Sequence, residues 1–530
     1  MKRIILAILL LLAALASGLA ELWGGLLPTI SWPFTLSRDF ALLRCDFPTT
    51  PMLAPEGQLH YFGWLCVLLT LLISLRLLLH RQTTSSQSEL SLKWQRFKSI
   101  KRGYAAFILL MVLILLAGLN QCIAGKRALV VSYQGQLSFP AFTRAIIQGK
   151  HYGLGGNAAL AETDYAQLLK QVGSPNGPDW VLMPPIPYSA NLNATSYPTE
   201  QLALKGDCLW DENQQSPYNG FASYMNAEGQ ELMRLRFRKG LPDGQAQGWS
   251  ESRRLIYLAQ YSQGKLLHEQ YTGEGQQADY LQATQSQPLH RIYYHPAPPL
   301  KGGHLLGTNS QGADIAAILY EGLQVNIQAI LFYIPCIYAI GLSMGMLMGY
   351  YGGSFDLLSQ RLIEILSQLP FIFVVMVLAD FLPSSMQGML LILLLLSLFG
   401  WMQMTYLIRT ATRREKSRDY VSAARVMGAS TPRILFTHIL PNLTSILITL
   451  LPFSVAALIL ALASLDYLGF GLPDQYASWG RLLNDGLGKL SSPWVLSSAF
   501  AALVFTLLLI SFIGEAVREA FDPRKHSYYR

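Results

Sequence analysis

Eight long apolar runs constrain the folding of this 530-residue chain more than any other feature of its sequence. A helix needs about 20 mostly apolar residues to cross a hydrocarbon core of about 30 Å. Inside that core every backbone N–H must find an internal acceptor, so we expect each run to be helical. The predicted spans are approximately residues 4–22, 61–79, 104–119, 327–348, 362–381, 389–408, 443–465 and 495–513.

The composition of the whole chain agrees with a bilayer as its solvent. Hydrophobic residues make up 51% of the sequence and charged residues only 14%, whereas soluble domains carry about 25% charged residues. The formal net charge is +8, but the basic residues gather in short segments between the apolar runs. Membrane lipid is therefore the expected surrounding, and nucleic acid is not an expected partner.

The distribution of Lys and Arg predicts the orientation, because these residues prefer cytoplasmic loops. The loop after the second run contains Arg81, Lys93, Arg96, Lys98, Lys101 and Arg102, and the loop after the sixth contains Arg409, Arg413, Arg414, Lys416 and Arg418. Alternate counting places both loops and both termini in the cytoplasm. The same count places residues 23–60, 120–326 and 466–494 outside.

The first apolar run has a second interpretation. Lys2 and Arg3, an apolar core and the small residues near 16–20 are also typical of a secretory signal peptide. We expect an uncleaved anchor, and cleavage would leave the rest of the topology unchanged.

The five cysteines show neither a CxxC motif nor a zinc-binding spacing. Cys45 and Cys208 fall in segments that we expect outside the membrane, where a disulfide could persist. The sequence alone does not pair them.

About 200 polar residues separate the third and fourth runs, which is far longer than an ordinary connection and predicts a folded domain. Residues 237–241 and 261–266 share a pattern of an aromatic residue, two polar residues, Gly and then Leu, at once or after Lys. The alternation in residues 255–261 leads into the second of these, as expected for β-hairpins with Gly at a positive-φ position. The pattern resembles MORN-like hairpin repeats near residues 220–275, although two copies are fewer than a stable array needs. An irregular β-rich insert with accidental similarity is the alternative.

Residues 418–442 read RDYVSAARVMGASTPRILFTHILPN and predict a helix, a sharp turn and a second helix. Residues 420–427 form the first helix, and Gly428 ends it as a left-handed C′ residue. Thr431 is the expected N-cap of the second helix, with Pro432 at its first position. A short helix with an Ala face suits a groove on a partner protein, although an ordinary amphipathic connector would show the same shape.

This loop resembles the coupling loop of permease subunits of ABC importers. The matching residues are Tyr420, Ala423, Ala424, Gly428, His438, Leu440, Pro441 and Asn442, and Ser422 stands where the family usually has an acid. The resemblance implies that the loop, taken as residues 415–442, inserts into a cleft of a nucleotide-binding subunit.

Further segments are similar to the dipeptide and oligopeptide branch of that family. LGTNSQGADIAAILYEG (306–322) resembles the signature before the family's second span, on Gly307, Thr308, Gly312 and Asp314, while Asn309 and Ala313 replace the commoner Asp and Arg. Residues 350–370, 464–473, 478–480 and 514–523 then follow in family order. Residues 102–104, 129–142 and 180–193 resemble the Yej-type subunits associated with peptide and microcin C uptake.

The resemblance implies an all-α polytopic protein with about eight spans, a six-span importer core and a β-rich periplasmic insert. Residues 1–100 would form an extra hairpin with a basic loop, 101–125 the first core span, 126–303 the insert and 304–530 the permease domain. The expected location is the bacterial inner membrane. The expected partners are a second permease subunit, nucleotide-binding ATPase subunits and a periplasmic peptide-binding protein.

The expected activity is transport of peptides by alternating access and not catalysis by this chain. No GxxxxGK[ST] motif occurs, so ATP and Mg²⁺ would be held by the partner ATPase, and no cofactor is expected here. An ion-coupled secondary transporter usually has ionisable residues deep in its spans, whereas Glu364 and Asp380 lie near opposite ends of the fifth run. A membrane-anchored periplasmic sensor would explain the insert but not the loop.

Overall fold

The computed structural model describes residues 89–119, 122–142, 147–155, 162–172, 179–190, 199–205, 208–210, 216–226, 230–250, 252–273, 276–381, 388–474 and 476–521. The predicted spans at 4–22 and 61–79, the signal-peptide alternative and the pairing of Cys45 with Cys208 lie outside these residues. The chain divides into two compact units, one formed by residues 1–191, 317–487 and 496–530 and the other by residues 192–316 and 488–495. Each unit is described by itself.

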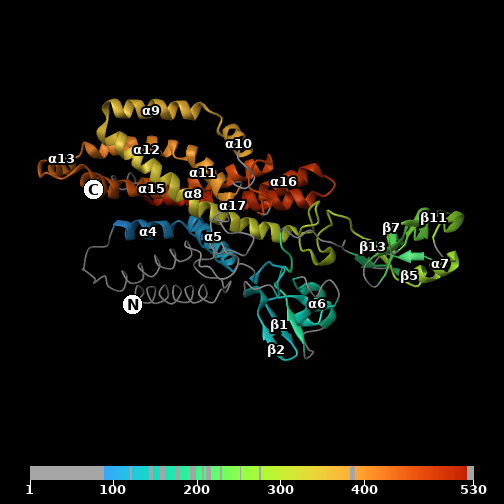
Figure 1. The fold of residues 1–530 in the computed structure, drawn as a ribbon. Coiled ribbons are helices and arrows are strands. Elements are labelled where there is room, and N and C mark those ends of the chain that lie inside the picture. Colours follow the sequence, from blue (N-terminus) through green and yellow to red (C-terminus); the bar gives the residue numbers. More distant parts are fainter. Residues whose placement is uncertain are drawn as a thin grey trace. The chain divides into compact units, whose positions relative to one another are not determined.

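The remaining six predicted spans all lie in helices (Figure 1). These helices are α5 (Lys101–Gly118), α8 (Ile315–Tyr351), α9 (Gly353–Gln368), α10 (Phe371–Phe381), α11 (Met389–Gly400), α12 (Met402–Lys416), α15 (Leu440–Tyr467) and α17 (Pro493–Phe521). In the described part of the chain, four helices are long and apolar enough to cross a membrane, or six if each of two bent pairs counts as one span. The predicted class of a mostly helical polytopic membrane protein is confirmed.

The span predicted at residues 362–381 lies in two helices with a sharp bend between them. α9 and α10 meet at an angle of 77°, and Leu369 between them has an extended backbone (φ −74°, ψ 127°). The cause is Pro370, because a proline disfavours the helical conformation in the residue before it. The sixth predicted span is also bent, by 42° between α11 and α12, and Gly400 lies at that junction.

A stripe of three glycines brings α8 and α12 into close contact. A Cβ atom at Gly341 would lie 3.1 Å from Trp401 O, one at Gly345 2.7 Å from Ile408 Cβ, and one at Gly349 2.6 Å from Thr412 Cβ. The glycines are four residues apart and therefore share one helix face. Small residues at this spacing let two membrane helices approach backbone to backbone, and Thr405 Oγ1 donates to Gly341 O at 3.3 Å across the contact.

Apolar side chains fill the rest of the helical bundle. Buried residues of α8, α11 and α15 form its largest cluster, with Tyr333, Leu393 and Leu462 among them. α4 (Glu89–Ser99), α5 and α17 form another cluster around Phe97 and Ala516. α16 (Trp479–Gly488) contributes Trp479, whose Nε1 donates to Leu319 O of α8 at 3.0 Å.

A small β region follows α5 in the same unit. It contains β1 (Val130–Tyr133), β2 (Gln136–Ser138) and β3 (Trp180–Leu182) in the antiparallel order β2-β1-β3, with α6 (Tyr165–Val172) and the 3₁₀ turns η3 (Pro140–Phe142) and η4 (Gly149–Tyr152). Arg127 pairs with Glu162 at 2.7 Å. Burial opposes ionisation of Glu162, but its hydrogen bond to Lys126 and the charge of Arg127 hold its pKa below the usual value.

The second unit is built on an antiparallel sheet with the strand order β12-β11-β10-β8-β7-β13-β4, to which β9 adds beside β8. Its elements are β4 (Thr199–Gln201), β7 (Gly220–Met225), β8 (Glu231–Arg238), β9 (Leu241–Pro242), β10 (Gly244–Trp249), β11 (Leu255–Ser262), β12 (Lys265–Tyr271), α7 (Gln277–Gln285), β13 (Leu289–Ile292) and η6 (Lys301–Gly303). A separate hairpin joins β5 (Ala203–Lys205) and β6 (Cys208–Trp210).

Both turns expected from the Gly pattern are present in this sheet. Lys239 and Gly240 have φ values of 52° and 79°, and Gln263 and Gly264 have 47° and 84°. Two consecutive positive φ angles are typical of the two-residue turns that match the twist of a hairpin. The MORN-like resemblance stays a prediction.

We predict that Gly345→Ala lowers the thermal unfolding midpoint of the purified protein. The new methyl group would lie 2.7 Å from Ile408 Cβ and 2.9 Å from Thr405 O, and overpacking of this kind costs about 1–3 kcal/mol. Gly388→Ala is the matched control, because no atom lies within 4 Å of its Cβ position and its backbone is extended. Equal midpoints for the two variants would contradict the tight α8–α12 contact.

Candidate functional site

The loop predicted to carry the function, residues 415–442, forms a bent segment that we call the elbow. α12 ends at Lys416, and α13 (Asp419–Val426) begins after two intervening residues. Gly428 has φ +78°, its N–H donates to Arg425 O at 3.0 Å, and the N–H of Ala429 donates to Ala424 O at 3.0 Å. These two bonds around a left-handed glycine form a Schellman motif, so the structure has the predicted helix stop.

The second helix of the elbow begins one residue earlier than predicted. Ser430, and not Thr431, is the N-cap of α14 (Thr431–Arg433), and Pro432 is at its second position. The reason is that Ser430 has the extended backbone and accepts the first helical hydrogen bond, from Ile434 N at 3.0 Å. The side chain of Ser430 makes no capping hydrogen bond.

A π-helical segment, η8 (Ile434–Ile439), connects α14 to α15. Pro441 lies in the first turn of α15, where it has no N–H for a helical hydrogen bond and its ring would clash with a carbonyl of the preceding turn. A wider π-helical turn relieves such a clash. The elbow therefore runs into the span without a break, as one helix from Thr431 to Tyr467.

α13 buries one side and exposes the other. Val421 is buried against residues of α8, α12 and η8, and Ala424 is buried as well, whereas Ser422 and Ala423 are exposed. The two alanines expected to share a face are thus separated.

The tip of α13 carries two exposed apolar side chains that sequence reasoning missed. Val426 is 89% exposed and Met427 is 80% exposed. Monomeric proteins seldom leave such pairs uncovered without a partner. The signal in the sequence was a pair of large apolar residues directly before the helix-ending glycine.

Three predicted residues meet on the other side of the elbow. Tyr420 Oη donates to Glu415 Oε2 at 2.9 Å, and Asn442 Nδ2 donates to Tyr420 Oη at 2.9 Å and to His438 O at 2.9 Å. Burial and the hydrogen bond to Glu415 raise the pKa of Tyr420. This network joins the ends of α12, α13 and η8.

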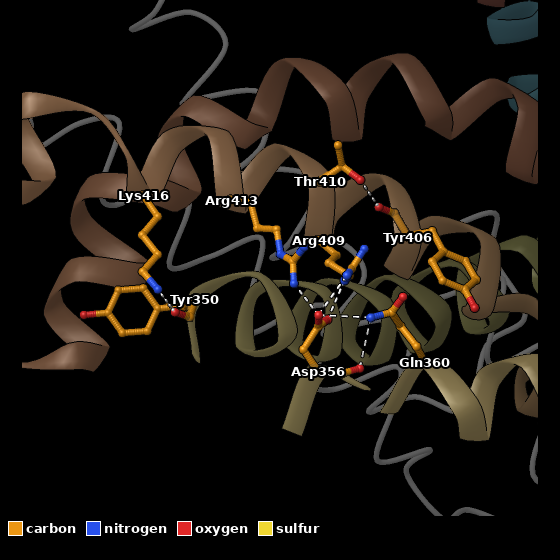
Figure 2. A network of polar contacts seen from close by, with 8 residues as sticks. All are labelled: Tyr350, Asp356, Gln360, Tyr406, Arg409, Thr410, Arg413 and Lys416. Atoms are coloured by element: carbon orange, nitrogen blue, oxygen red, sulfur yellow. Dashed lines mark hydrogen bonds and ion pairs between the residues drawn. The ribbon is translucent and has the colours of Figure 1, made fainter. Parts of the chain in front are cut away.

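A buried carboxylate ties α12 to α9 (Figure 2). Asp356 is only 1% exposed and accepts hydrogen bonds from Arg409 Nη2 at 2.8 Å and Gln360 Nε2 at 3.0 Å. Arg413, one turn further along α12, also pairs with Asp356. We call these four residues the Asp356 cluster.

The end of α8 is tied to the elbow in a similar way. Lys416 Nζ donates to Tyr350 O and lies 5.4 Å from the centroid of the Tyr350 ring, as Figure 2 shows. The Arg425 guanidinium of α13 lies 5.7 Å from the same ring. Between α8 and α9, Gly352 and Gly353 both have positive φ angles, 68° and 56°, which lets the chain reverse in one step.

The predicted signature residues lie in the other unit and form a compact loop before α8. His304 Nδ1 and Asp314 Oδ2 are 2.8 Å apart and buried, and Thr308 Oγ1 accepts from Ala297 N at 2.8 Å. Gly307 and Gly312 have φ angles of 82° and 86°, and a Cβ atom at Gly307 would lie 2.4 Å from Ala297 O. Within the described ranges, no group of three or more His, Cys, Asp or Glu residues could hold a metal ion.

The segments at 464–473 and 478–480 also meet around one carboxylate. Asp466 Oδ1 accepts from Leu472 N at 2.6 Å, and Asp466 Oδ2 accepts from Ser478 Oγ at 2.5 Å. Gly471 and Gly480 both lie where a Cβ atom would clash with Asp466. The two sequence motifs therefore belong to one compact turn that follows α15.

We predict that Asp356→Asn destabilises the purified protein strongly. The amide keeps the shape of the carboxylate but leaves the Arg409 guanidinium, 14% exposed, without its counter-charge, and removing one partner of a buried pair costs about 3–5 kcal/mol. Glu364→Gln in the same helix is the control, because its pair with Arg361 is largely exposed and worth at most about 1 kcal/mol. Thermal unfolding checks both; equal midpoints would show that the cluster is not a stabilising joint.

Comparison with known proteins agrees with this polytopic, transporter-like architecture. Residues 341–527 match the family model described as "Binding-protein-dependent transport system inner membrane component". The chain is 30% identical over 434 residues to the "Peptidoglycan transport system permease protein YejE" of Agrobacterium fabrum, which covers 82% of this chain and 92% of that protein. The chain therefore belongs to the family of binding-protein-dependent, inner-membrane permeases of ABC transporters.

Other relatives match a smaller share of the chain. The "Inner membrane ABC transporter permease protein YejE" of Escherichia coli is 39% identical over 230 residues, 43% of this chain and 66% of that protein. The "Oligopeptide transport system permease protein OppC" of the same species is 34% identical over 229 residues, 43% of this chain and 75% of that protein. A chain of an inward-facing MetNI methionine ABC transporter aligns at 18% identity with a TM-score of 0.33, over 39% of this chain and 96% of that one; a score this low supports no argument. The predicted resemblance, the fold class and the inner-membrane location are confirmed.

Proposed function

We propose that this chain is the permease subunit of an ATP-driven importer that moves peptides or peptide-like compounds across the bacterial inner membrane by alternating access. The observation that carries the proposal is the elbow, a short stopped helix with an apolar tip that is followed, after the turn at Gly428, by a 37-residue helix. A mechanical input at the tip can therefore reach a membrane span through one short turn, which two backbone hydrogen bonds close. Two relatives described as permeases of peptidoglycan and oligopeptide transport systems support the substrate class.

In this proposal the tip of α13 docks in a cleft of a nucleotide-binding subunit, and ATP and Mg²⁺ are held there. Val426 and Met427 supply apolar area for that contact. Burial of such side chains is worth about 1.5–3 kcal/mol each. Ser422 stands where the family usually has an acid, so the contact depends on packing more than on charge at that position.

Movement of α13 would spread to three membrane helices. Lys416 and Arg425 connect the elbow to Tyr350 at the end of α8. The Asp356 cluster connects α12 to α9, and η8 continues into α15. Because several contacts join the elbow to these helices, they favour a shift of the helices together over local bending.

The same proposal assigns roles to the partner proteins, the β regions and the signature residues before α8. A second permease subunit completes the pathway, because one set of these helices does not enclose a channel, and a periplasmic binding protein delivers the substrate. The β regions lie on the outer side. Gly307, Thr308, Gly312 and Asp314 fix the direction in which α8 begins, as the compact loop around His304 supports.

The main alternatives were an ion-coupled secondary transporter and a membrane-anchored sensor. Family membership and the elbow favour the importer over both.

Co-purification in mild detergent tests the class: we expect an ATPase subunit and a second permease with the wild-type chain. We expect loss of the ATPase alone with Val426→Ser/Met427→Ser. Recovery of the wild-type chain without either partner would count against the proposal.

We predict that Gly428→Val abolishes transport and uncouples ATP hydrolysis from it, while membrane insertion stays normal. A β-branched residue is strained at φ +78°, at a cost of about 1–2 kcal/mol, and no atom lies within 4 Å of the Cβ position, so the strain acts on the helix stop alone. The measurements are peptide uptake and ATPase activity of the assembled complex in proteoliposomes.

Gly388→Val provides the control for this prediction. Its Cβ position is equally open, but its extended backbone (φ −156°, ψ 170°) accepts any residue. Normal, coupled uptake by Gly428→Val would refute the role of the elbow.

A further inference from the structure

The sheet of the second unit has two chemically different faces. One face is its core: Leu289, Tyr224, Met233, Gly248, Tyr257 and Tyr271 form a continuous cross-strand row from β13 to β12. Tyr280 of α7 packs over this row and donates to Leu232 O at 3.0 Å. A Cβ atom at Gly248 would lie 2.3 Å from Tyr280 Oη, so the helix sits directly on the strands.

The opposite face, which we call the open face, is mostly polar. Its central row runs through all seven strands of the main path and consists of Gln201, His290, Ser223, Arg234, Gln247, Leu258 and Gln270. In the neighbouring row Phe221 is paired with Arg236, and Gln245, Gln260 and His268 lie across β10, β11 and β12. Long amide and cationic side chains dominate these two rows.

Aromatic rings on this face lie over the guanidinium groups. Arg234 lies 5.4 Å from the Trp249 ring centroid and 5.2 Å from that of Tyr294, and Arg236 lies 5.9 Å from that of Phe221. Phe221 is 52% exposed and Tyr294 is 43% exposed. A stacked guanidinium keeps its N–H edge available for a carboxylate, which it binds through two parallel hydrogen bonds.

The charge of the open face is positive. Glu231 occupies the edge of Arg234 with bonds of 2.8 and 2.7 Å, so that pair is neutral. Arg236 is exposed, and none of the paired positions named above for the two rows carries a carboxylate. An anionic partner therefore complements this face.

The shape of the face indicates what kind of anion fits. Seven strands about 4.8 Å apart span roughly 29 Å, and small ligands need concave pockets that bury most of their surface. An extended polymer can instead cross a flat face, with sugar rings stacked on Phe221 and Tyr294. Side-chain amides both donate and accept hydrogen bonds, which suits hydroxyl and N-acetyl groups.

We infer that the open face binds a carboxylate-bearing glycopeptide polymer with the chemistry of peptidoglycan, with Arg236 on a stem-peptide carboxylate and Phe221 beneath a sugar ring. The similarity to the relative described as a peptidoglycan transport permease covers 434 residues, more than residues 300–530 contain, so it extends upstream of the permease core. The inference rests on the proposed function only for placing the sheet outside the inner membrane.

Co-sedimentation of the detergent-purified full chain with isolated peptidoglycan sacculi tests the inference. We expect retention of the wild-type chain, which falls at least tenfold for Arg236→Gln/Phe221→Ala and also falls when stem peptides are removed from the glycan by an amidase. Arg236→Lys keeps the positive charge but cannot make the two parallel hydrogen bonds of a guanidinium group, so we expect intermediate retention. Lys150→Gln, an exposed charge in η4 of the other unit, should bind like the wild type.

Each other outcome would overturn the inference. These outcomes are no retention of the wild-type chain, equal retention of the double variant, or equal loss with Lys150→Gln, which would mean unspecific charge attraction. Normal sacculus binding by a double variant that no longer binds a soluble acidic protein would assign the face to a protein partner instead. Gel filtration of each variant confirms folding. Since the assay needs neither ATPase nor transport, its failure leaves the proposed function intact, and a failed transport assay leaves this result intact.

Discussion

The close contact between α8 and α12 is the constraint on which the membrane part of this structure depends. Gly341, Gly345 and Gly349 leave the α8 side of the shared face without Cβ atoms at three successive turns, so the two backbones come close together. With larger residues there, α12 would stand further from the bundle, and Arg409 would not reach a carboxylate on α9. The glycine stripe thus determines where the charged end of α12 lies.

The charged contacts at that end then fix the elbow. A single buried carboxylate, Asp356, shares two guanidinium groups from successive turns of α12. Such a pair contributes little net stability compared with an apolar contact, but it is costly to break and specifies one arrangement. Lys416 and Arg425 hold the neighbouring Tyr350. The tip at Val426 and Met427 is therefore exposed on a firmly held support, which is the geometry that a mechanical contact with an ATPase requires.

The β-rich unit follows a different physical rule. Alternation along each strand separates an aromatic core row, covered by Tyr280 of α7, from a row of glutamines and arginines on the open face. The same hairpins that were visible from Gly240 and Gly264 thus build a surface whose chemistry appears only when strands distant in sequence are paired. β13, for example, returns after α7 to bring His290 beside both Ser223 and Gln201.

Sequence alone determined the features that depend on local physics. Apolar length predicted the helices, because backbone groups in a bilayer must be satisfied within one segment, and glycine at positive φ predicted the stop at Gly428 and both hairpin turns. Motif order predicted the family. The tertiary structure alone decided that Ala423 is exposed while Ala424 is buried, that Ser430 and not Thr431 caps the second helix, and that Arg409 and Arg413 share Asp356. It also decided that the run 362–381 bends by 77° at Pro370, although that proline was visible. These outcomes depend on contacts between segments that are far apart in the sequence. Hydrophobic periodicity and residue spacing describe one segment at a time, so they do not show which residue pairs with a buried charge or which surface covers an exposed face.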